Sequence, residues 1–76
     1  MKTKSKASPL VRFVKTQRKA LGITQRELAD KAGVGLRFVR DLEQGRTGLR
    51  LNKLDELLRV FGARLEPVKY NDGDAA

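Results

Sequence analysis

The sequence predicts a small all-α domain of four helices. Its 76 residues are enough for one hydrophobic core and no second domain. Along four stretches apolar residues recur at helical intervals, and a glycine follows each stretch. A fifth stretch, residues 63–70, alternates only weakly and contains Pro67, which confines any strand there to the edge of a sheet.

The first helix is expected over residues 9–21. Pro9 suits the first helical position, and Ser8 can accept a hydrogen bond as the N-cap. Gly22 can end the helix in the left-handed conformation. The apolar residues that recur on one side are Leu10, Val14 and Leu21.

The second helix is expected over residues 25–31. Thr24 and Glu27 have the spacing of a capping box, in which each side chain accepts a hydrogen bond from the other residue's backbone amide. Gly33 closes this helix, and only Val34 and Gly35 follow before a new helical pattern begins.

The third and fourth helices are expected over residues 36–44 and 51–61. Val39 and Leu42 have the spacing that buries one face of the third helix. Gly62 closes the fourth helix. The fourth helix has a wide apolar stripe made of Leu51, Leu54, Leu57, Leu58 and Phe61.

The second and third helices with their short glycine-containing turn predict a helix-turn-helix motif. Ala29 is small where the third helix must cross closely, and Gly33 permits the left-handed conformation of the turn. The side chains expected to point inward are Val34, Val39 and Leu42. Those expected to point outward are Leu36, Arg37, Arg40, Asp41 and Gln44.

The chain is strongly and unevenly basic. It carries 17 Lys and Arg against 9 Asp and Glu, a net charge of +8. Residues 1–50 hold 13 basic and 4 acidic side chains, whereas residues 51–76 hold 4 basic and 5 acidic ones. A surface of this kind attracts polyanions such as nucleic acid. We therefore expect the polyanion-binding surface in the first two thirds of the chain.

Several classes of function are not expected. The chain has no histidine and no cysteine, so it lacks the commonest general base, thiolate metal ligands and disulfides. It has no glycine-rich phosphate loop, and we expect neither an enzyme nor a metal or cofactor site. No apolar run is long enough to cross a membrane and no secretory signal is visible, so we expect a cytoplasmic, nucleoid-associated protein.

Three segments carry a resemblance to a known family: residues 21–29 (LGITQRELA), 32–34 (AGV) and 42–46 (LEQGR). Over about residues 10–62 the chain resembles the lambda-repressor-like helix-turn-helix proteins, also called the Xre family. Within that family, residues 40–43 (RDLE) and the strand-like ending look most like antitoxins of the HipB type. Those antitoxins are autorepressors paired with a HipA-type kinase toxin.

The resemblance implies that the third helix lies in the major groove of DNA with its N-terminal part on the base edges. The positions that match are Gly35, Leu36, Arg37 and Arg40. An arginine can donate two hydrogen bonds to guanine, so we predict that Arg37 and Arg40 read guanines. The alternatives are solvated charges or phosphate contacts, and for Arg40 a pair with Asp41 or Glu43 on its own helix.

The resemblance also implies contacts to the DNA backbone. The matching positions are Thr24, Gln25, Gln44 and Arg46. Gln25 begins the second helix, where amides and the helix dipole favour a phosphate, and the family places it against the third helix as well. The alternative is an ordinary exposed glutamine. Thr24 acts mainly as a cap.

Arg18 and Glu43 match positions that form a buried ion pair between the first and third helices in phage repressors of the family. Both residues fall on or beside apolar faces of their helices, which supports the same ion pair in this chain. Phe38 stands where phage repressors commonly have a small polar residue, so it either packs under the second helix or lies against a thymine methyl group. Phe13 and Phe61 are interpreted as core or dimer residues.

A homodimer is predicted from the last third of the chain, because small domains usually read operators with two-fold symmetry. The expected interface combines the fourth helix with a strand over residues 63–70 that pairs with the same strand of a second copy. Its residues are Leu58, Phe61, Leu65 and Val68.

The sequence therefore predicts a helix-turn-helix domain over residues 9–62, a dimerisation strand over 63–70 and a disordered tail over 71–76. Residues 1–8 form a flexible basic arm that either reaches around the duplex or is merely solvated. The expected function is that of a transcriptional repressor that binds double-stranded DNA at a palindromic operator. The same protein is expected to be the antitoxin of a HipA-like toxin. The alternative is a stand-alone Xre-type or phage-type regulator.

Overall fold

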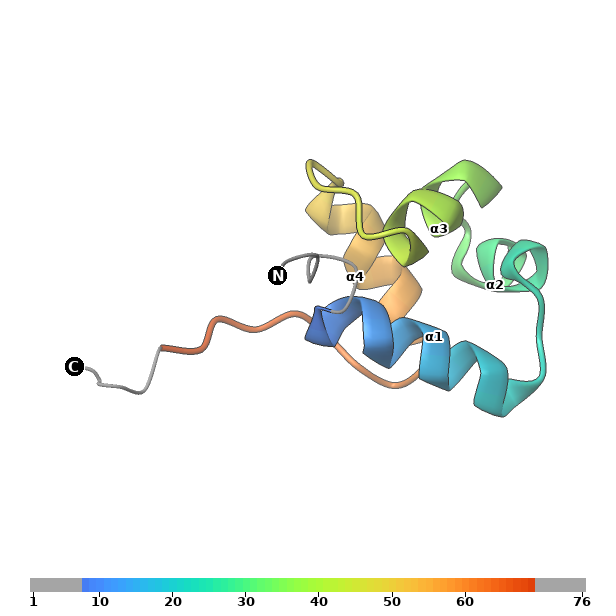
Figure 1. The fold of residues 1–76 in the computed structure, drawn as a ribbon, viewed down its shortest axis with the longest axis horizontal. Helices are drawn as coiled ribbons and strands as arrows, with labels where there is room; N and C mark the ends of the chain where they lie inside the picture. Colours follow the sequence, from blue (N-terminus) through green and yellow to red (C-terminus); the bar gives the residue numbers. More distant parts are fainter. Residues whose placement is uncertain (1–7, 70–76) are drawn as a thin grey trace, which may run out of the picture.

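The computed structural model describes residues 8–69, and these form four helices (Figure 1). They are α1 (Pro9–Leu21), α2 (Gln25–Ala32), α3 (Leu36–Glu43) and α4 (Leu51–Arg59). Each helix lies within two residues of its predicted bounds, and the all-α class is confirmed. Most of the predicted basic arm, and all of the tail predicted over residues 71–76, lie outside the described residues.

Local sequence signals set the helix starts. The Ser8 hydroxyl accepts a hydrogen bond from the Val11 amide at 3.2 Å, as expected of an N-cap. At the start of α2 the Thr24 hydroxyl accepts from the Glu27 amide at 3.0 Å, and the Glu27 carboxylate accepts from the Thr24 amide at 2.8 Å. The predicted capping box is therefore confirmed.

Gly33 makes the sharp turn between α2 and α3. Its φ of 75° lies in the left-handed region, and its amide together with that of Val34 donates to the carbonyl of Ala29. Gly35 then begins α3 as an N-cap with an ordinary extended backbone, φ −76°. The turn thus needs a glycine at one of these two positions and not at the other.

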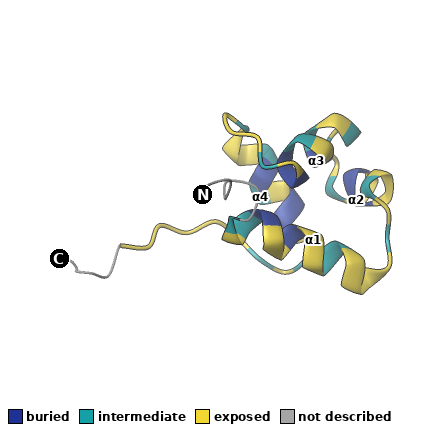
Figure 2. Ribbon diagram, in the orientation of Figure 1, coloured by how far each residue is buried: buried dark blue, intermediate teal, exposed yellow. Residues whose placement is uncertain are grey.

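The core is built from all four helices. α2 packs on α3 and on α4, and α1 packs on α3. Figure 2 shows the buried positions facing the space between the helices, with the exposed positions on the outside. The largest fully buried side chains are Val14, Leu28, Val39, Leu42 and Leu57.

Three side chains in or against the core can be compared with the positions expected from the sequence. Leu36, expected to point outward, is half-buried and packs against the core. Phe38 also packs against the core, which is the first of its two alternatives. Leu58, expected at a dimer interface, is 3% exposed and belongs to the core of its own chain, because α4 turns this side of its wide stripe inward.

The described part of the C-terminal segment, residues 63–69, has no regular secondary structure. The strand predicted over residues 63–70 is therefore not formed within the chain. Within residues 8–69 its backbone has no neighbouring strand to supply ladder hydrogen bonds, and Pro67 has no amide hydrogen to donate. In Figure 1 the segment passes the start of α1 and then leaves the helical body.

Replacing Gly33 with alanine should destabilise the domain by about 1 kcal/mol, because alanine is disfavoured in the left-handed region. No atom lies within 4 Å of the position that a Cβ would occupy, so the cost is conformational and not steric. Gly35→Ser is the control, since its site is equally open, its φ is negative and serine is a favoured N-cap residue. The free energy of unfolding of this variant in urea should not fall by more than about 0.5 kcal/mol below wild type. Equal losses in both variants would contradict this account.

Candidate nucleic-acid interface

The outward side of α3 borders a shallow hollow of about 410 Å³. Its walls are Leu36, Arg37, Arg40, Asp41, Gln44 and Arg46. Gly35 lies exposed at the start of the same helix, so its backbone is accessible. All four positions predicted to face bases therefore lie on or next to one side of α3, although Leu36 offers only part of its side chain.

Arg37 and Arg40 are exposed, and neither forms an ion pair with any residue from 8 to 69. The two acidic residues that were alternative partners of Arg40 are engaged elsewhere: Asp41 pairs with Arg46, and Glu43 pairs with Arg18. Both guanidinium groups are thus available to an external acceptor. An arginine presents five N–H donors in a planar fork, which suits a phosphate or a guanine edge.

Gln44 and Arg46 lie together just beyond the end of α3. The Nε of Arg46 is 3.2 Å from Oδ1 of Asp41 and donates to Oε1 of Gln44 at 3.3 Å. Asp41, expected to point outward and offered as a partner of Arg40, lies four residues after Arg37 and hence on the same side of the helix. The structure adds this carboxylate to an otherwise basic hollow.

A buried carboxylate joins α3 to α1 and to the start of α2. Arg18 donates to Glu43 from Nε at 2.7 Å and from Nη2 at 3.0 Å, which is a bidentate ion pair. Arg18 also donates from Nη1 to the carbonyl of Ile23 at 2.9 Å, and Gln25 donates to Glu43 at 3.1 Å. Glu43 is only 4% exposed, so its charge depends on these partners.

The surroundings of this pair shift both pKa values. Burial alone would raise the pKa of Glu43, but the hydrogen bonds from Arg18 and Gln25 and the charges of Arg18 and Lys15 outweigh it and lower that pKa. The hydrogen bond to Glu43 raises the pKa of Arg18. Both groups therefore remain charged at neutral pH.

The two residues predicted at the start of α2 have intramolecular partners. The Thr24 hydroxyl is engaged in the capping box, and the Gln25 amide nitrogen in the contact with Glu43. Gln25 is half-buried, unlike the ordinary exposed glutamine that was its alternative. In the structure it connects α2 to the last residue of α3.

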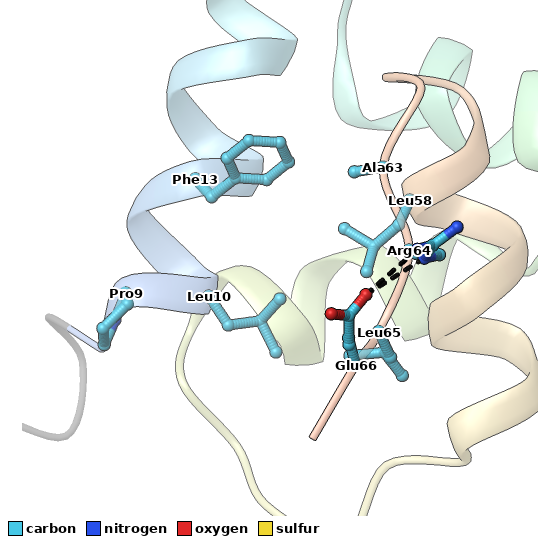
Figure 3. Close-up of a pocket in the computed structure, with 8 residues that line it drawn as sticks. All are labelled: Pro9, Leu10, Phe13, Leu58, Ala63, Arg64, Leu65 and Glu66. Atoms are coloured by element: carbon cyan, nitrogen blue, oxygen red, sulfur yellow. Dashed lines mark hydrogen bonds and ion pairs between the residues drawn. The ribbon is translucent and has the colours of Figure 1, made fainter. Parts of the chain in front are cut away.

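A second hollow, of about 480 Å³, lies between α1 and the C-terminal segment. Figure 3 shows Leu10 and Phe13 of α1 opposite Leu58, Ala63 and Leu65, with the Arg64–Glu66 ion pair at the rim. This hollow is predominantly apolar, in contrast to the one beside α3.

The remaining residues predicted for a dimer lie in or beyond this apolar hollow. Phe61 is half-buried and meets Phe13 edge-on, with the ring centres 6.2 Å apart. Leu65 is 38% exposed and is tied to α4 by its amide, which donates to Asp55 at 3.3 Å. Val68 is 86% exposed. Residues 8–69 of a single chain therefore leave apolar surface of these side chains exposed.

Residues 14–68, more than half of the chain, match the family model described as "Helix-turn-helix". The chain belongs to the helix-turn-helix family. A relative from Sinorhizobium fredii, described as the uncharacterized HTH-type transcriptional regulator y4mF, is 39% identical over 66 residues, covering 87% of this chain and 83% of its own. No solved structure matches the chain at a significant level.

The predicted helix-turn-helix motif is thus confirmed at the level of the family. Nothing in the matches distinguishes a HipB-type member from other members.

Between residues 8 and 69 no helix has the length and apolar character needed to span a membrane. The same part of the chain has no cluster of three acidic, histidine or cysteine side chains arranged to hold a metal ion.

Removing one partner of the Arg18–Glu43 pair should be costly. Arg18→Met leaves a buried, uncompensated carboxylate, and we expect a loss of about 3 kcal/mol in the free energy of unfolding at pH 7. The double variant Arg18→Met/Glu43→Leu should recover much of that loss, because it removes the charge as well. Urea unfolding of the wild type and the two variants measures both effects. A double variant no more stable than Arg18→Met would contradict the buried-charge explanation.

The lowered pKa of Glu43 predicts an acid-dependent loss of stability. A carboxyl group with a depressed pKa in the folded state stabilises the fold above the unfolded pKa, which is about 4.3, and this contribution disappears as pH falls through the folded pKa. Thermal unfolding between pH 7 and pH 2 should therefore show a steeper loss for the wild type than for Arg18→Met/Glu43→Leu. If the melting temperatures of the two proteins fall in parallel with pH, Glu43 does not contribute to the acid-dependent loss of stability.

Proposed function

We propose that this protein is a sequence-specific transcriptional repressor that binds double-stranded DNA and reads the major groove with α3. The observation that carries the proposal is the pair of exposed arginines, Arg37 and Arg40, on the second helix of the helix-turn-helix. Neither has an acidic partner within residues 8–69. Exposed guanidinium groups on a helix that fits the major groove are suited to guanine O6 and N7.

The other residues at the start of α3 fit a smaller part in base recognition. Gly35 offers backbone atoms without a side chain and so permits a close approach to the DNA. Leu36 is half-buried, and its exposed part can contact a thymine methyl group. We therefore assign most of the sequence discrimination to Arg37 and Arg40.

Backbone contacts are proposed at the two ends of the motif. Gln44 and Arg46 follow α3, and the two Nη groups of Arg46 donate no hydrogen bond within residues 8–69. Thr24 and Gln25 lie at the start of α2, where free amides and the helix dipole favour a phosphate. Such contacts determine register and salt dependence and carry no sequence information.

The proposed assembly is a homodimer on a palindromic operator. Leu65 and Val68 are the exposed apolar residues of the C-terminal segment, next to the apolar hollow. A second copy of this segment would supply the strand partner that a single chain lacks. The predicted pairing of residues 63–70 across the two-fold axis belongs to this proposal.

The antitoxin role belongs to the proposal as well. It rests on the resemblance of residues 40–43 and of the C-terminal segment to HipB-type antitoxins. A HipA-like kinase toxin would then be a second partner. By binding DNA the protein would repress its own gene, and it would act in the cytoplasm. A stand-alone regulator without a toxin is the alternative, and a kinase-like gene directly beside this one would distinguish the two.

Arg37→Ala should weaken binding to a selected operator by about 1–3 kcal/mol, because it removes a bidentate contact to guanine. Affinity for scrambled DNA of the same length should fall much less. Fluorescence anisotropy at fixed salt measures both. Arg59→Ala is a matched control, since Arg59 is an exposed arginine of α4 without an ion pair among residues 8–69. Equal losses on operator and scrambled DNA would refute base reading by Arg37.

Light scattering at micromolar concentration should show a dimer. The double variant Leu65→Lys/Val68→Lys should be monomeric, because it introduces like charges into the proposed apolar interface. Thr16→Lys/Ala20→Lys adds the same charge on exposed positions of α1 and should remain dimeric. A monomeric wild type that binds one chain per half-site would overturn the proposed dimer.

A further inference from the structure

The hollow beside α3 contains one acidic side chain among three arginines. Asp41 lies four residues after Arg37, so both project from the same side of the helix. The rest of this surface is suited to phosphates and to acceptor groups of bases. A carboxylate at this position weakens attraction to any polyanion, and its presence needs a reason other than affinity.

The contacts of Asp41 leave half of its carboxylate available. Oδ1 is 3.2 Å from Nε of Arg46, so one oxygen of the carboxylate is engaged in an ion pair. Oδ2 accepts no hydrogen bond from residues 8–69. The side chain is 30% exposed, so it is accessible from the hollow.

We propose that Asp41 is a specificity-determining residue that accepts a hydrogen bond from the N4 amino group of a cytosine in the operator. An ionised carboxylate can only accept, and the major groove offers donors only on cytosine and adenine. Adenine presents its N7 acceptor beside the amino group, which repels the carboxylate. Guanine and thymine present acceptors there as well, so cytosine is the base that Asp41 favours.

This assignment rests on the proposed function and adds a second kind of readout to it. Arg37 and Arg40 select guanines by donating, whereas Asp41 selects a cytosine by accepting. The carboxylate also disfavours non-operator DNA, because most major-groove edges would face it with a lone pair. Asp41 would thereby raise the ratio of specific to non-specific binding instead of the affinity itself.

The test is selection of binding sites from a random duplex pool by the full chain and by Asp41→Asn. Asparagine can donate and accept, and it pairs with adenine N6 and N7. At one base pair of each half-site the preference should change from cytosine to adenine, with the guanines unchanged. Anisotropy on the two duplexes should show a preference of about tenfold that reverses between wild type and variant.

Two controls separate base reading from indirect effects. Glu56→Gln removes the same charge from an exposed position of α4 that does not line the hollow, and it should keep the wild-type preference. Arg46→Gln removes the ion-pair partner and should keep the preference for cytosine while weakening binding to all duplexes. Thermal unfolding of each variant verifies its fold.

Each contrary result has a distinct meaning. If Asp41→Asn selects the same sites as the wild type, or if Arg46→Gln changes the preferred base in the same way, Asp41 does not read a base and the inference fails while the proposed function stands. If the wild type enriches no sequence from the pool, both the proposed function and the inference are overturned.

Discussion

The buried carboxylate of Glu43 constrains the rest of the structure. It ends α3 at the point where that helix meets α1 and the start of α2, and it is nearly inaccessible to water. A buried charge without partners is strongly unfavourable, so Arg18 and Gln25 must reach it together. Because Arg18 also bonds the carbonyl of Ile23, the chain that connects α1 to α2 is held by the same network. The position of α3 relative to α1 and α2 is thereby restricted.

This restriction matters for a surface that reads bases. Side chains discriminate bases only when the helix that carries them is held in a defined register and orientation. Glu43 faces the interior, and Asp41, two residues earlier, faces the hollow. Neighbouring turns of one short helix thus combine a structural charge on one side with the exposed arginines on the other. The acidic residues of α3 are both paired with other arginines, so Arg37 and Arg40 have no acidic partner among residues 8–69.

The hollow beside α3 and the hollow beside the C-terminal segment differ in chemistry, and the difference follows the uneven charge of the sequence. The hollow beside α3 is lined mainly by charged side chains, whereas the one between α1 and the C-terminal segment is lined mainly by apolar ones. A polyanion suits the first and an apolar protein surface suits the second. The proposed repressor uses both, with DNA on one and a second copy of the chain on the other.

The sequence by itself determined the features that depend on neighbours along the chain. The Ser8 cap, the Thr24–Glu27 capping box and the turn at Gly33 involve residues at most five positions apart, and hydrophobic spacing identified all four helices. The ion-pair partners of the charged residues of α3 were harder to predict from the sequence. Arg18 and Glu43 are 25 residues apart and were paired only through the resemblance to a family. The spacing that placed Arg40 beside Asp41 or Glu43 could not show that both carboxylates have other partners.

Only the tertiary structure decided which part of an apolar stripe is buried. The stripe of α4 is wide enough for a core and an interface, and in the structure Leu58 belongs to the core. The strand predicted over residues 63–70 was not formed in the single chain, because a strand needs a partner that periodicity cannot supply. In both cases the outcome depends on which residues lie opposite in space. Neighbours along the chain do not reveal those residues.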